Sequence, residues 1–297
     1  MAIPPRPAFV SGNFLAASIY DLISDYVSSP ARNAPSTAIS LTSLMAPYMS
    51  SASDLQSICH LWGVLFFMAT TYHPSSPKHS LLVDLVLEIR KCSAPPYAEL
   101  LAYEKQWGCR FWTDLPMWEA VWSDFEFDAP LVPRMAERKA DWGLLENRFL
   151  PGPWRNRDGE AMASVAWASL NAFGARLHAQ TDLELFDSRA LSALVEALEE
   201  NRSAKALDDI VPAAACWILY AGKTIKDSST SHCTKGDMCS GEKGPSNERW
   251  SSWKLRLGDL TDRTDIKRNT RIYAKQARDE MQRLDSGSTV SEERKLF

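Results

Sequence analysis

Residues 12–28 read GNFLAASIYDLISDYVS and carry a periodicity that returns through most of the chain. The apolar side chains of this segment recur at steps of three and four residues: Phe14, Leu15, Ile19, Leu22, Ile23, Tyr26 and Val27. Such steps place side chains on one face of an α-helix, whereas a half-buried strand would alternate. The segment therefore predicts an amphipathic helix, and Pro30 ends it.

Segments that follow this helix repeat its pattern. We expect further helices over 54–72, 77–94, 97–106, 114–126, 133–150, 160–180, 188–200, 209–226, 247–260 and 265–285, and a short one within 35–53. Asp54, Asp114, Ser188 and Asp209 are the expected capping residues, with Pro212 in the first turn of its helix. Because no useful run of period-two alternation occurs, the predicted fold is all-α: an irregular bundle of about ten helices with little or no sheet.

The domain organisation is predicted from segments that break the pattern. Residues 1–285 are expected to form a single helical domain, with a sub-boundary near 151–159 where Pro151-Gly152-Pro153 interrupts the chain. Residues 227–247 are almost free of apolar side chains and predict a mobile loop. Residues 286–297 predict a frayed tail.

Charge is divided unevenly along the chain, whose net charge is −4. Residues 1–221 carry 17 basic and 25 acidic side chains, whereas residues 222–297 carry 16 and 12. This contrast favours an acidic partner for the C-terminal part, but Lys and Arg lack the dense clustering of nucleic-acid binders. We therefore expect no nucleic-acid partner.

The cellular setting is predicted from cysteines and apolar runs. Six cysteines are mostly far apart, and the N-terminal residues lack the charged and apolar regions of a secretory signal. The longest apolar stretch, residues 61–69, is well short of the roughly 20 residues that span a bilayer. We expect a cytoplasmic protein with free thiols and no membrane span.

Known catalytic patterns are missing. The chain has neither phosphate-binding glycine motif, nor the serine-hydrolase elbow, nor the helical zinc-protease pattern. His232, Cys233, Asp237 and Cys239 are ligand types for a metal, but they lack the Cys-x2-Cys spacing of a zinc knuckle. Asp208-Asp209 is interpreted as a helix cap rather than a magnesium motif. Neither a metal nor a cofactor is predicted.

The helix expected at 160–180 carries a semi-polar stripe of Trp167, Asn171, Gly174 and His178, because steps of three and four residues align side chains. Asn171 and His178 could orient a ligand oxygen and move a proton near neutral pH, as could His60, and these three are the catalytic candidates. The structural alternative, which we prefer, is that Asn171 bonds the backbone, His178 lies near the exposed helix end, and Trp167 is core.

Eleven tryptophans make an apolar ligand pocket plausible. The ligand-binding candidates are Trp62, Trp107, Trp112, Trp167, Arg176, Trp217 and Tyr220. Helix packing explains Trp217 and the small residues that precede it equally well. Arg176 is interpreted as part of a surface ion pair rather than as an anion-binding residue.

Two segments, WASLNAFGARL at 167–177 and VPAAACWILYAG at 211–222, resemble fungal proteins grouped under domain of unknown function 3632. The segment from Trp107 to Pro116 and the pair Trp250 and Trp253 extend the resemblance over most of the chain, although Gly174 replaces an alanine of the family pattern. The resemblance implies a fungal, cytosolic, helical protein without a known cofactor, and it transfers no catalytic residue.

Two functions stay open. The first is a protein-interaction or accessory protein, which uses basic C-terminal helices or an aromatic groove to hold a partner. The alternative is a cofactor-independent enzyme or binder of an apolar small molecule, of the cyclisation type, in fungal specialised metabolism. The sequence predicts neither the oligomeric state nor whether the protein is an enzyme.

Overall fold

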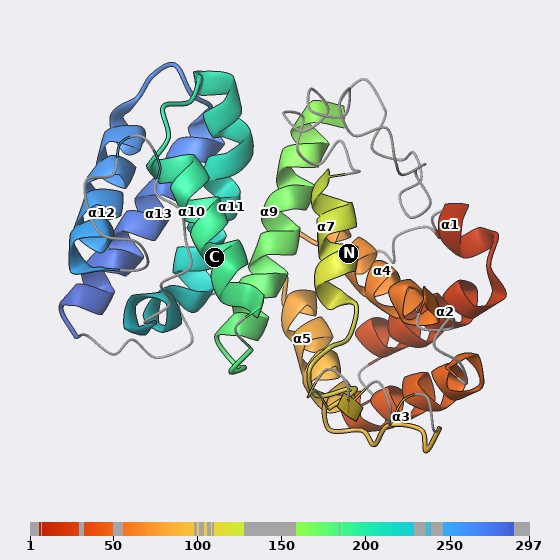
Figure 1. The fold of residues 1–297 in the computed structure, drawn as a ribbon. Coiled ribbons are helices and arrows are strands. Elements are labelled where there is room, and N and C mark those ends of the chain that lie inside the picture. The colour runs from red at the N-terminus through yellow and green to blue at the C-terminus, as the bar shows by residue number, and fades with distance from the viewer. Residues whose placement is uncertain are drawn as a thin grey trace. The chain divides into compact units, whose positions relative to one another are not determined.

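The computed structural model describes residues 6, 8–29, 33–49, 56–97, 100, 104–105, 108, 110–127, 159–183, 185–228, 236, 238 and 246–287. These residues form helices and their connections and contain no strand (Figure 1). The predicted all-α multi-helix fold is thereby confirmed. By its internal contacts the chain divides into two compact units.

The first unit comprises Met1–Tyr72, Pro77–Leu131 and Met135–Gly159. Its helices are α1 (Ala8–Ser11), α2 (Phe14–Ser28), α3 (Ala34–Met45), the 3-10 turn η1 (Ala46–Tyr48), α4 (Gln56–Thr71), α5 (Lys78–Ile89) and α7 (Trp118–Phe127). α2 packs on α3 and α4, α3 packs on α5, and α4 packs on α7. Every residue from 61 to 70 of α4 is buried, as its apolar sequence requires.

The second unit comprises His73–Ser76, Val132–Arg134 and Glu160–Phe297. Its helices are α9 (Gly159–His178), α10 (Leu185–Leu198), α11 (Ala204–Asp227), α12 (Asn247–Asp262) and α13 (Arg268–Asp285). α12 and α13 lie side by side, and α13 also packs along α11 (Figure 1). α10 contacts both α11 and α12, so four helices of this unit share one core.

The start of α11 was predicted wrongly. The helix begins at Ala204, where Ser203 accepts the N–H of Ala206 at 3.3 Å, and it continues through Pro212. Proline has no N–H for the carbonyl four residues earlier, which here belongs to Asp208. The Ser164 hydroxyl of α9 donates to that carbonyl at 3.0 Å. A neighbouring helix thus replaces the missing bond, and the proline stays inside α11.

The structure also corrects the predictions for two further capping residues. α10 begins at Leu185, so Ser188 lies inside its first turn, where its hydroxyl donates to the Leu185 carbonyl at 3.3 Å. Asp208 caps a different helix: its side chain accepts the N–H of Lys267 at 2.8 Å and the Thr270 hydroxyl at 2.6 Å. Asp208 therefore fixes the start of α13 rather than that of its own helix.

The main division along the chain falls between Gly159 and Glu160, at the edge of the predicted sub-boundary. The single domain over 1–285 stays a prediction. The expected helix at 133–150, most of that at 97–106, the cap Asp54, most of the loop 227–247 and the tail from 288 lie outside the described residues. Among the described residues, no helix has the length and apolarity that crossing a membrane requires.

Candidate functional site

Asn171 and Trp217 form a bond between α9 and α11. The Trp217 indole N–H donates to Asn171 Oδ1 at 2.7 Å, and Asn171 Nδ2 donates to the Trp167 carbonyl at 2.9 Å. Asn171 is 1% exposed, and Trp217 is fully buried. The structural interpretation of Asn171 is therefore confirmed, because its amide bonds the backbone and also satisfies a buried indole. Trp167 belongs to the same core.

His178 does not lie at an exposed helix end, and that expectation is wrong. The first turn of α10 covers it, so the side chain is 4% exposed, with Nε2 3.2 Å from Asp187 Oδ1. Its ring also lies edge-on to Trp217 and near Phe186. Burial lowers the pKa of His178, although the Asp187 carboxylate opposes this shift. Burial therefore favours the neutral imidazole.

Arg176 and Tyr220 meet at the carbonyl of Pro74, in the segment His73–Ser76. Arg176 Nη2 donates to this oxygen at 2.8 Å, and the Tyr220 hydroxyl donates to it at 3.2 Å. The Arg176 guanidinium also lies over the Tyr220 ring, 3.4 Å from its centre. Arg176 thus binds backbone and an aromatic ring, and the surface ion pair expected for it is wrong.

Glu199, which directly follows α10, forms a deeply buried ion pair in the second unit. It is 2% exposed, and Arg249, which is fully buried, donates to its two oxygens at 2.7 and 2.9 Å. The Trp253 indole donates at 2.7 Å and the Gly236 N–H at 3.0 Å. Burial would raise the pKa of Glu199, but the bonds from Arg249, Gly236 and Trp253 outweigh it and lower that pKa.

Gly236 fits this site because it has no side chain. A Cβ at position 236 would lie 2.5 Å from Glu199 Cβ. The Met238 N–H bonds the Glu199 carbonyl at 2.8 Å, so two backbone groups of this segment are held by one residue. Sequence reasoning missed Glu199, because an acid at the end of an apolar helix usually faces water.

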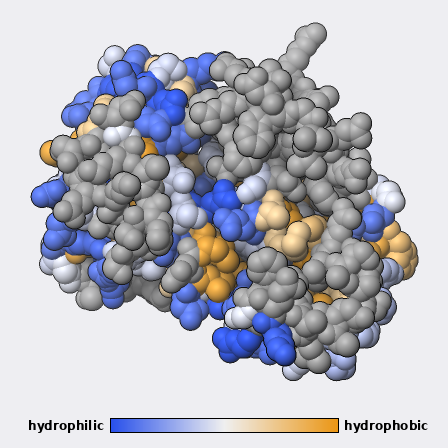
Figure 2. All heavy atoms as spheres, viewed as in Figure 1, coloured by the Kyte–Doolittle hydropathy of each residue, from blue (hydrophilic) through white to orange (hydrophobic). Residues whose placement is uncertain are grey.

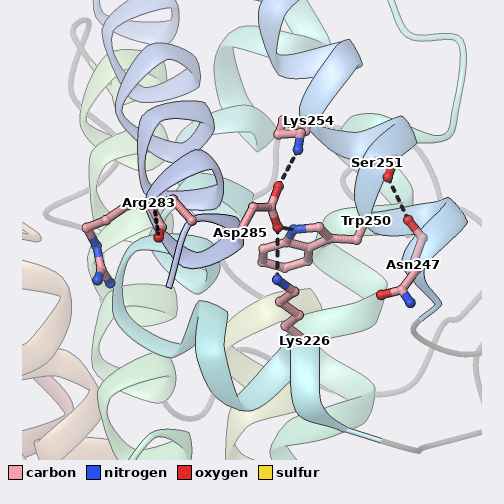
Figure 3. A network of polar contacts seen from close by, with 8 residues as sticks. Lys226, Asn247, Trp250, Ser251, Lys254, Arg283 and Asp285 are labelled. Carbon is pink, nitrogen blue, oxygen red and sulfur yellow. Dashed lines mark hydrogen bonds and ion pairs between the residues drawn. The ribbon is translucent and has the colours of Figure 1, made fainter. Parts of the chain in front are cut away.

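Asp285 joins three helices at the end of α13 (Figure 3). Its Oδ1 accepts Lys226 Nζ of α11 and the Trp250 indole N–H of α12, both at 2.9 Å, and its Oδ2 accepts Lys254 Nζ. Burial would raise the pKa of Asp285, but the bonds from Lys254, Lys226 and Trp250 lower it to about 2. This carboxylate is therefore ionised throughout the physiological range.

Two aromatic candidates of the first unit, Trp62 and Trp112, are also buried. The Trp62 indole donates to the Pro116 carbonyl at 2.6 Å, and Trp62 lies edge-on to Trp118, which also contacts Phe66. Trp112 is 1% exposed, and its indole N–H has no acceptor among the described residues. His60 Nε2 lies 3.2 Å from Asn13 Nδ2, the residue that caps α2, and burial lowers the pKa of His60.

The predicted pocket residues do not gather in one unit. Trp62 and Trp112 lie in the first unit, whereas Trp167 and Trp217 lie in the second. Trp107 and the cluster His232, Cys233, Asp237 and Cys239 fall outside the described residues. Within the described ranges, no group of three or more His, Cys, Asp or Glu side chains is placed to hold a metal ion.

A basic surface runs along α13. The excess of basic residues in 222–297 indicated positive charge in this part of the chain but not its position. The members of this surface, which we name the basic stripe, share steps of three and four residues and hence one side of the helix: Arg268, Arg271, Lys275 and Arg278. Arg268 and Lys275 are exposed. Asp279 is 2.8 Å from Lys275 and 3.5 Å from Arg278. The described residues around α12 are mainly hydrophilic in the face that Figure 2 shows.

The described residues define an all-helical protein, and among them no cluster of side chains is placed to hold a metal ion. Within that class, the chain belongs to the family described as "Protein of unknown function (DUF3632)", whose model matches residues 62–257. The match covers both α9 and α11, which carry the motifs of the resemblance, and ends before α13. No curated protein and no solved structure matches the chain.

Proposed function

We propose that the protein is a cytosolic interaction protein, and that the basic stripe on α13 binds an acidic, amphipathic protein segment. The stripe repeats a basic residue at each turn of one helix face, and this single observation carries the proposal. Ile272, which is 42% exposed, lies one turn from both Arg268 and Lys275. The surface thus offers one row of positive charge beside one apolar side chain, which suits a partner of the opposite pattern.

The core supports a surface function over a catalytic one. Asn171 and Arg176, two of the polar candidates in the family motifs, are engaged with the chain's own groups. Their hydrogen bonds hold α9, α11 and the Pro74 segment in place. An interaction protein needs such a rigid core, and its recognition chemistry then lies on exposed helices.

Charge favours an acidic protein over nucleic acid or an anionic membrane. The stripe has four basic side chains in one row, and Asp279 already pairs with two of them. A chain with a net charge of −4 is repelled at long range by a polyanion, whereas a short acidic segment meets only the local positive field.

The test uses a synthetic amphipathic peptide of Glu and Leu, and compares it with a DNA duplex and with phosphatidylserine vesicles. We expect the peptide to bind in a salt-sensitive way, and R268E/K275E to weaken binding about tenfold, because two exposed ion pairs become repulsive. K91E/K223E is the matched control, since it changes the charge equally at exposed sites outside α13, one in the turn after α5 and one on α11. Equal affinity in both variants, or preferred binding to DNA or vesicles, would refute the proposal.

A further inference from the structure

His178 is a buried titratable side chain that the proposed function does not use. It ends α9 and is 4% exposed, and its ring lies 6.2 Å from the Phe186 ring of α10 and 6.0 Å from the Trp217 ring of α11, between centroids. Groups from three helices therefore enclose one imidazole. The pH at which such a ring takes up a proton is decided by these surroundings.

The Asp187 carboxylate keeps protonation of His178 within reach. Its Oδ1 lies 3.2 Å from His178 Nε2, and the carbonyl end of α9 also attracts a positive charge at this position. No other charged group of the described residues shifts the pKa of His178. From α11 it faces the uncharged Trp217 ring, Arg176 on α9 itself is bonded elsewhere, and Asp182 in the connection to α10 is exposed.

The enclosed arrangement has no acceptor for the second N–H of an imidazolium. Both ring nitrogens of His178 are shielded from solvent, and neither makes a hydrogen bond of normal geometry with a described residue. A protonated ring carries an N–H on each nitrogen. Nε2 can direct its N–H to Asp187, whereas the Nδ1 N–H stays buried beside aromatic rings. A buried charged donor without an acceptor is costly, and burial accordingly lowers the pKa of His178.

The corner between α9 and α10 is the part that can move to relieve this cost. Two of its backbone bonds are long: the Thr181 N–H lies 3.4 Å from the His178 carbonyl, and the Phe186 N–H lies 3.3 Å from the Leu183 carbonyl. Bonds of this length are weak. The rest of α10 packs on α11 and α12, so its first turn can separate from His178 while the body of the helix stays in place.

We propose that His178 and Asp187 form an acid-sensitive switch, in which protonation of the buried imidazole releases the first turn of α10 from the end of α9. Once the turn has moved, water reaches both ring nitrogens and satisfies the imidazolium. The open ring has the ordinary pKa of about 6.5 and the enclosed ring a lower one, so the open arrangement binds the proton more readily. Closure is therefore favoured above about pH 6.5 and is lost progressively as the pH falls below it. The switch does not depend on the acidic partner of the basic stripe.

Native-state hydrogen exchange of the full chain at pH 7, 6 and 5 tests the switch, with each amide corrected for its intrinsic exchange rate. The reporters are the amides of Arg189 and Ala190, which bond back to the first turn of α10. We expect their protection factors to fall by up to about tenfold per pH unit below 6.5. The buried Ala274 and Ala277 of α13 should keep theirs, which distinguishes local opening from unfolding of the whole unit.

His178→Gln is the matched variant, because its side chain is polar but does not titrate. We expect its protection at Arg189 to be independent of pH over this range. In the wild type, the carbon-bound ring protons of His178 should titrate by NMR with a pKa below 6.5, a measurement that needs no variant.

Three results would overturn the proposal. The first is unchanged protection of the Arg189 and Ala190 amides between pH 7 and pH 5. The second is an equal loss of protection in the wild type and in His178→Gln, which would assign the opening to another group. The third is a His178 ring that titrates at or above pH 6.5 while the first turn of α10 stays protected, which would mean that the pair with Asp187 stabilises the closed arrangement.

Discussion

Three buried indoles of the second unit have charged or amide partners, whereas the described indoles of the first unit pack mainly against other rings. Trp217, Trp250 and Trp253 donate to Asn171, Asp285 and Glu199. In the first unit, edge-on ring contacts dominate: Trp118 lies at 5.1 Å from Trp62 and at 4.6 Å from Phe66, and Phe66 lies at 5.6 Å from Trp122, between centroids.

This difference in partners implies a difference in what holds each unit together. Ring contacts depend on shape and are insensitive to pH, whereas a carboxylate that accepts an indole N–H also needs a cation to balance its charge. Two of these three acceptors are carboxylates with Arg or Lys partners. We therefore expect the second unit to respond to charge and pH more strongly than the first.

The largest effect on stability is expected when the Glu199 carboxylate of the second unit is removed. Glu199→Ala leaves Arg249 buried without a counter-charge and two N–H groups without an acceptor. We expect the free energy of unfolding to fall by about 3–5 kcal/mol, measured by urea denaturation with tryptophan fluorescence as the signal.

The double variant E199A/R249M is the matched control. It removes both charges, so most of the lost stability should return, since an apolar replacement of a buried pair is often neutral. A single variant as stable as the wild type would show that water reaches Arg249 and that the pair is not truly buried.

The sequence predicts helices well where one face is apolar and short-range contacts decide the ends. The periodicity of residues 12–28 places α2 to within two residues, because the Asn13 cap and the apolar face are both local. The start of α11 could not be found in the same way. Ser164, the hydroxyl that permits Pro212 inside the helix, lies 44 residues before the carbonyl it bonds.

The candidate site shows the same difference between what local sequence predicts and what distant contacts decide. Asn171, Arg176, Trp217 and Tyr220 were singled out from the sequence as site candidates, which stays a prediction, and their hydrogen-bond partners were not predictable. Pro74 lies 102 residues from Arg176 and 146 from Tyr220, and Asn171 lies 46 from Trp217. Periodicity gives the face of a helix on which a side chain lies, and only the tertiary arrangement gives the atom that it bonds.

A smaller effect is expected when two buried tryptophans of the first unit are replaced. Trp62→Phe and Trp112→Phe both replace a fully packed indole by a smaller ring, so their losses of buried apolar area are similar. Only Trp62→Phe also leaves the Pro116 carbonyl without its donor. We expect it to lower the free energy of unfolding by about 1 kcal/mol more than Trp112→Phe, in urea denaturation. Equal losses would mean that the Trp112 N–H also has an acceptor in solution.

The smallest expected effect concerns pH and the Asp285 carboxylate at the end of α13. In the folded chain its pKa is about 2, below the value of about 3.9 for an unperturbed aspartate. A folded pKa below the unfolded one gives stability that is present above about pH 4 and is lost as the pH falls towards 2.

Asp285→Asn tests that pH dependence, because the amide keeps the shape of the side chain and removes its charge. We expect the variant to be less stable than the wild type by under about 1 kcal/mol at pH 6, since Lys226 and Lys254 are partly exposed, and the gap to narrow from pH 4 to pH 3. Urea midpoints at each pH, with and without 1 M NaCl, provide the measurement, and salt should shrink the gap. Asp279→Asn, at a more exposed ion pair, is the control, and Glu199 titrates alike in all three proteins. A gap that stays constant with pH would place the contribution of Asp285 in shape rather than charge, and would make the second unit resemble the first.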